Sequence, residues 1–158
     1  MALVLGLLPG TYEQVASTTT RFMHNPMVYL LAGTLLLAFF VVYQIHKGNR
    51  TGPANNLWLI YLLYISVVEE FAFRLFLPIV LADAMHFYAA AFISNVIFAA
   101  IHYVTLRWRW RNCVFVFFGG MGFSHMLVNH QDLIAVILAH WFFTFLNTPT
   151  PPAGDRQA

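Results

Sequence analysis

Charged side chains are scarce in this chain of 158 residues, since Lys, Arg, Asp and Glu together make up only 9% of it. A water-soluble domain of this length carries about 25% charged residues. The chain is instead 60% hydrophobic and 17% aromatic, with a mean hydropathy of +0.70. So few charges cannot cover a surface that faces water. The composition therefore predicts an all-α membrane protein embedded in a lipid bilayer.

Cysteine and net charge are low as well. The single cysteine, Cys113, excludes a disulfide bond within the chain. The formal net charge of +2 is too small to indicate a nucleic-acid partner. The opening stretch MALVLGLLPG lacks a basic region, so no signal peptide is expected there.

Hydrophobic runs long enough to cross a bilayer, which takes about 20 residues, make up most of the chain. We expect a polytopic bundle of five such helices: Pro26–His46, 57–82, 87–106, 112–128 and Leu133–Asn147. The fourth run is interrupted by GGMGFSH and is predicted to be short, kinked or re-entrant. Residues 1–25 are expected to form an N-terminal segment at the membrane interface or partly inserted. The bundle occupies 26–148, and the proline-rich tail, 149–158, is expected to be disordered.

Basic residues collect in two of the four loops. The loops at 46–56 and 107–111 carry them, whereas those at 83–86 and 129–132 are not basic. The sequence RWRWR at 107–111 is typical of an interfacial anchor. With five spans the basic loops share one side, which the positive-inside rule makes cytoplasmic, with the tail inside and the N-terminus outside.

Three charged residues stand inside the second run, in the stretch VVEEFAFRL at 67–75. Near the middle of a membrane helix each costs about 2.5–3.5 kcal/mol, so together they oppose insertion by about 7–10 kcal/mol. Glu70 and Arg74 are four residues apart with the acid first, which favours an ion pair on one helix face. We expect this pair to neutralise itself and let the helix insert.

Glu69 is the charge left without a local partner. It lies about 100° around the helix from Glu70 and is therefore expected to point into the bundle. An intramembrane carboxylate that pairs with nothing on its own helix suits general acid–base chemistry. The alternative is a structural polar cluster that fixes the packing of the helices.

Two of the seven histidines, His102 and His140, lie within expected spans, whereas the others lie at span ends, in loops or after the glycine-rich stretch. Phe98 precedes His102 by four residues, so the two share a helix face. His140, Thr144 and Asn147 also share a face and form a polar stripe on an apolar helix. If both histidines converge on the unpaired glutamate, three helices bring a carboxylate and two imidazoles into one cavity.

Other readings of these residues remain open. A glutamate and two histidines also form a catalytic zinc set. No HExxH motif occurs, however, so the expected cofactor is none, with zinc as the alternative. His102 and His140 on different helices are also compatible with bis-histidine haem, which would leave the charged stretch without a role. A lone membrane histidine is often only a packing residue.

Three motifs in order resemble the CAAX-protease and bacteriocin-processing family of intramembrane proteases, also called the ABI family. The residues at 69–74 match its EExxxR motif, and those at 98–102 match its FxxxH motif on the following helix. His140 resembles the histidine of its third motif, HxxxN/D, on a later helix. The resemblance extends from residue 57 to residue 147.

The resemblance implies a glutamate-dependent endopeptidase with a role for each motif residue. Glu69 would be the general base that activates a water molecule, and His102 would help to position that water. His140 and a polar partner would stabilise the oxyanion. Glu70 and Arg74 would be structural support.

The chain departs from the third motif because Thr144 stands where the family has Asn or Asp. Thr144 itself or Asn147, one turn further, is expected to replace that group. A catalytically silent scaffold or immunity partner in a membrane complex is therefore the alternative function.

The chain resembles the small prokaryotic members of the family, so we expect it in a prokaryotic inner membrane. The expected substrate is a membrane-anchored or C-terminally tagged protein, with no requirement for a prenylated CAAX sequence. Association with a second copy or with other membrane proteins is compatible with this class.

Overall fold

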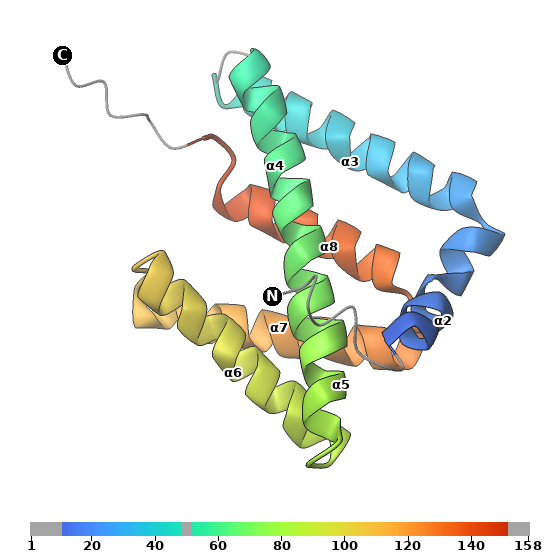
Figure 1. Cartoon of the computed structure of the whole chain (residues 1–158). Helices are drawn as coiled ribbons and strands as arrows, with labels where there is room; N and C mark the ends of the chain where they lie inside the picture. The colour runs from blue at the N-terminus through green and yellow to red at the C-terminus, as the bar shows by residue number, and fades with distance from the viewer. Residues whose placement is uncertain (1–10, 49–51, 152–158) are drawn as a thin grey trace.

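The computed structural model describes residues 11–48 and 52–151, which fold into α-helices without any strand (Figure 1). The all-α bundle expected from the composition is therefore confirmed. The first helix of the described part of the chain, α2, runs Thr11–His24 and forms most of the predicted N-terminal segment. The stretch expected not to be a signal peptide and most of the proline-rich tail lie outside the described residues.

Helices α3 and α8 have the bounds that the sequence predicts. Helix α3 spans Pro26–His46, and its first residue is a proline, whose missing N–H costs nothing at a helix start. Helix α8 spans Leu133–Asn147, and the carboxylate of Asp132 caps it by accepting a hydrogen bond from the Ala135 backbone N–H at 3.0 Å.

The charged stretch lies in a long helix that runs through the centre of the molecule (Figure 1). Helix α4, Pro53–Glu70, continues without a break into a π-helical segment, η1, Phe71–Phe76, and then into α5, Leu77–Ala82. Pro78 follows the π-helical segment, and a proline removes the backbone donor that would bond to the carbonyl four residues earlier. Such π-helical turns are common at functional sites.

Helices α6, Phe87–Thr105, and α7, Trp110–His130, form an antiparallel pair at one end of the long helix (Figure 1). Helix α7 is continuous through GGMGFSH, so the prediction of a short segment is wrong, while a kinked or re-entrant path stays untested. Inside an apolar medium an opened backbone hydrogen bond finds no water to replace it, which keeps glycines helical. The predicted loop at 107–111 is also shorter than expected, because α7 already begins at Trp110.

Among the described residues, three helices are long and apolar enough to cross a membrane: α3, α6 and α7. Helix α8 is apolar but shorter, and the long helix carries the three charges. Many large apolar side chains on α3 and α6 are exposed on the molecular surface, as expected where lipid surrounds the protein. The chain is therefore an integral membrane protein, and five as the number of spans stays a prediction.

Helix α8 packs closely against α4, while α3 lies further from the rest of the bundle (Figure 1). Two side-chain hydrogen bonds join the ends of α3 to residues that flank α8. Tyr29 Oη donates to Asp132 Oδ2 at 2.6 Å, and Gln44 Nε2 donates to the Pro149 carbonyl at 2.8 Å.

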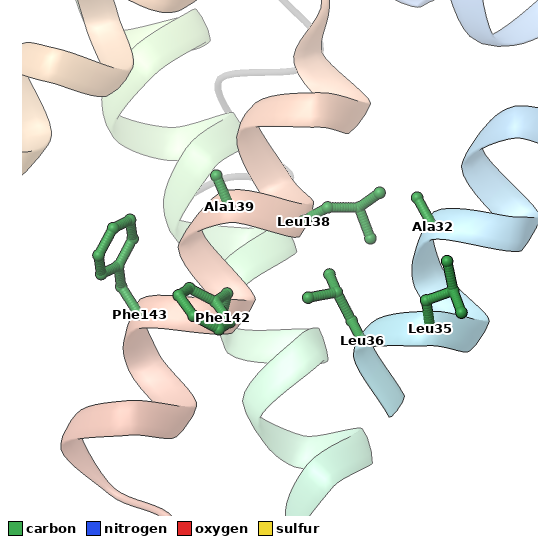
Figure 2. A pocket seen from close by; sticks show the side chains of 7 residues that line it. All are labelled: Ala32, Leu35, Leu36, Leu138, Ala139, Phe142 and Phe143. Atoms are coloured by element: carbon green, nitrogen blue, oxygen red, sulfur yellow. The ribbon is translucent and has the colours of Figure 1, made fainter. Parts of the chain in front are cut away.

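An apolar pocket of about 520 Å³ lies between these two hydrogen bonds. It is lined by residues of α3 and α8 alone, and Figure 2 shows Leu138 of α8 extending toward Ala32 of α3. None of the lining side chains is polar or titratable, so this pocket is not the chemical site. Ala139, which lines it, is nevertheless adjacent in sequence to His140.

Candidate active site

The ion pair predicted between Glu70 and Arg74 is present. Arg74 Nε lies 3.5 Å from Glu70 Oε2, and both side chains are fully buried. The Arg74 guanidinium also lies over the ring of Phe98, 4.0 Å from its centroid, a cation–π contact that replaces part of its lost hydration.

His140 lies between the two glutamates. Its Nδ1 is 2.5 Å from Glu70 Oε1, and its Nε2 is 3.5 Å from Glu69 Oε2. Carboxylate oxygens only accept hydrogen bonds, so the Nδ1 of His140 is the donor in its bond to Glu70. The imidazole thereby lies beside both glutamates, and Glu70 also pairs with Arg74.

The two adjacent glutamates differ in their access to solvent. The side chain of Glu69 is 23% exposed, whereas that of Glu70 is completely buried. Glu69 is therefore the more accessible carboxylate of the pair.

His102 joins the cluster through Phe98, and no hydrogen bond or ion pair joins it to a glutamate in the described structure. Its Nδ1 donates to the Phe98 carbonyl at 2.8 Å, since a carbonyl oxygen can only accept a hydrogen bond. The Phe98 ring centroid lies 4.6 Å from the ring of His102 and 6.1 Å from the ring of His140. On its other side His102 packs against Trp108, at 5.2 Å.

The two candidates for the oxyanion partner lie on α8 beyond His140. Thr144 is half-buried, and its backbone carbonyl accepts hydrogen bonds from Thr148. Asn147 is exposed at the last turn of the helix. No hydrogen bond joins either side chain to the cluster within the described residues, so their roles stay predictions.

Several residues that the motifs do not contain also build the site. Phe123 of α7 places its ring 5.4 Å from that of His140, and Ser94 of α6 donates to the Phe73 carbonyl of the π-helical segment at 2.5 Å. Asn95 is fully buried in α6, beside Gly120 of α7. A buried amide in a membrane helix is itself a signal of a site.

That Trp108 anchors the chain at the lipid headgroups stays a prediction; its half-buried ring lies 5.2 Å from that of His102. The alternation of arginine and tryptophan alone does not reveal this inward position. Within the described part of the chain, no group of three or more His, Cys, Asp and Glu side chains is arranged to hold a metal ion.

These features define a polytopic helical membrane protein with a largely buried cluster of two glutamates, an arginine and a histidine. The family model "Type II CAAX prenyl endopeptidase Rce1-like" matches residues 51–146. This match covers more than half of the chain and all three motifs, and the chain belongs to this family of proteases. Neither a curated protein nor a solved structure matches it.

Proposed function

We propose that this protein is an intramembrane endopeptidase in which Glu69 activates the water that hydrolyses a peptide bond. Membership of a protease family supports the reaction class. The observation that carries the assignment is the difference between the two glutamates, because Glu69 is partly exposed beside His140 whereas Glu70 is completely buried.

Glu69 has two tasks in this proposal. Its carboxylate takes a proton from water as the oxygen attacks the scissile carbonyl, and it later gives that proton to the leaving amine. Once Glu69 is protonated, it no longer competes for the Nε2–H of His140. That donor is then free for the developing oxyanion, with Thr144 or Asn147 as the second donor.

The substrate class that we propose is a membrane-anchored or C-terminally tagged protein. The name of the matching family refers to prenylated CAAX proteins. A fluorescence-quenched peptide that ends in a prenylated CAAX sequence and its unprenylated copy are therefore the two probes. Cleavage of both supports our expectation that the prenyl group is not required.

The test compares wild type with Glu69→Gln in proteoliposomes. Loss of a general base lowers the rate by about 10²–10⁴-fold, and the amide keeps the size of the side chain. Glu13→Gln on α2 is the matched control, because Glu13 is an exposed glutamate outside the cluster. Equal cleavage by wild type and Glu69→Gln, at equal thermal stability, would contradict the proposal.

A catalytically silent scaffold or immunity partner is the second candidate. It is favoured by Thr144 in the place of Asn or Asp and by the exposure of Asn147. This function predicts that wild type cleaves neither peptide and that Glu69→Gln retains its membrane partners.

Two cofactor alternatives have direct tests. Haem iron needs a free imidazole nitrogen on each histidine, but both nitrogens of His140 face carboxylates. The absence of a Soret band from the purified protein is therefore expected. Zinc dependence would appear as activity lost to a chelator and restored by the metal, and we expect no such loss.

A further inference from the structure

Asn95 is a buried amide beside the ion pair, and it belongs to none of the three motifs. Its Nδ2 donates to the Ala91 carbonyl at 2.8 Å and to the Ser124 hydroxyl at 2.9 Å. Because both amide hydrogens are used on these acceptors, the orientation of the side chain is fixed. Its Oδ1 therefore faces away from both of them.

Arg74 lies where this oxygen points. A side chain at position 120 would place its Cβ 2.7 Å from Arg74 Nη2 and closer still to Asn95 Oδ1. The guanidinium and the amide oxygen are therefore neighbours above the backbone of Gly120. Gly120 is buried, so this approach takes place inside the bundle.

These neighbouring groups are complementary and unsatisfied. Both terminal nitrogens of Arg74 and the Oδ1 of Asn95 are buried without a hydrogen-bond partner in the described structure. The nitrogens are donors and the oxygen is an acceptor. Buried groups of this kind are almost always paired with each other or through an ordered water.

We propose that Asn95 is a positioning residue for the active site: its Oδ1 accepts a hydrogen bond from the Arg74 guanidinium, directly or through one ordered water. Ser124 holds the amide in the required orientation from α7. Arg74 pairs with Glu70, and Glu70 in turn holds the Nδ1 of His140. Asn95 thereby fixes the imidazole that faces Glu69.

The effect of Asn95 on cleavage rests on the proposed function, whereas its hydrogen bond to Arg74 does not. Two measurements separate the two claims. The first follows the side-chain resonances of Arg74 by ¹⁵N NMR in arginine-labelled protein, where Arg74→Lys identifies the signal. The second measures kcat and KM with the quenched peptides.

Asn95→Leu removes the acceptor at similar volume. We expect the Arg74 Nη resonances to shift, kcat to fall about ten- to a hundredfold through misplacement of the reacting groups, and KM to stay within about twofold. Asn129→Leu is the control, because Asn129 is an exposed amide at the end of α7. Ser124→Ala, which removes only one hydroxyl, should shift the same signals less and serves if the leucine variant does not fold.

The glycines provide a matched pair. Gly120→Ala should also shift the Arg74 signal, because its Cβ would collide with both groups. Gly119→Ala should leave the signal unchanged, because a Cβ there meets nothing within 4 Å.

Unchanged Arg74 resonances in folded Asn95→Leu and Ser124→Ala protein would overturn the inference. Shifted resonances with a wild-type kcat would also overturn it, because Asn95 would then be only a packing residue. If Glu69→Gln retains cleavage, the proposed function fails, while the Arg74 signal still decides whether Asn95 holds the arginine.

Discussion

At the scale of single residues, two adjacent glutamates have different environments. The spacing of Glu70 and Arg74 predicts their ion pair, because that pair depends only on local helix geometry. The bond between Glu70 and His140 joins residues 70 positions apart, so only the packing of α4 against α8 reveals it. The sequence therefore predicts the charges of the site better than their partners.

The buried pair gives a prediction about stability. Glu70→Ala leaves the Arg74 guanidinium buried without its counter-ion, and breaking such a pair costs about 3–5 kcal/mol. Glu69→Ala should cost much less, because Glu69 is partly exposed. Unfolding of both variants in detergent, followed by circular dichroism, measures the difference. Equal losses of stability would contradict this account of the pair.

At the scale of helices, the hydrophobic pattern predicts where helices begin and end better than it predicts irregular turns within them. It gives the ends of α3 and α8, where a proline and a capping aspartate mark the boundary. It does not give the π-helical segment, which depends on how the helix packs around the site. The glycine-rich stretch misleads, because glycine propensities measured in water overstate helix breaking within a membrane.

The attachment of α3 to α8 can be tested at this scale. Tyr29→Phe removes the hydrogen bond to the Asp132 carboxylate, and a bond to a charged group contributes about 1.5–3 kcal/mol. We expect a lower free energy of unfolding in detergent. Tyr43→Phe, on the same helix, is the control, because no hydrogen bond of the Tyr43 hydroxyl occurs in the described structure. An equal loss of unfolding free energy in both variants would show that the hydrogen bond between Tyr29 and Asp132 does not stabilise α3.

At the scale of the whole molecule, five crossings would place alternate loops on opposite sides of the membrane. The long helix, α6, α7 and α8 run back and forth in this order (Figure 1). Composition alone predicts the membrane class. The number of crossings does not follow from it, because charges lower the hydropathy of the long helix and α8 is shorter than a typical span.

Labelling with a membrane-impermeant maleimide tests the crossings. In a Cys113→Ser background, Lys47→Cys and Ala84→Cys lie on either side of the long helix. The positive-inside rule predicts that Ala84→Cys reacts from outside intact cells and that Lys47→Cys reacts only after permeabilisation. Reaction of both from the same side would mean that the long helix does not cross.

The central claim is that Glu69 is the base of a peptide hydrolase. The rate of peptide cleavage by Glu69→Gln relative to wild type, in proteoliposomes with equal amounts of folded protein, tests it most directly. The account predicts a rate lower by about 10²–10⁴-fold, with Glu13→Gln unaffected. Cleavage by Glu69→Gln at the wild-type rate would contradict it.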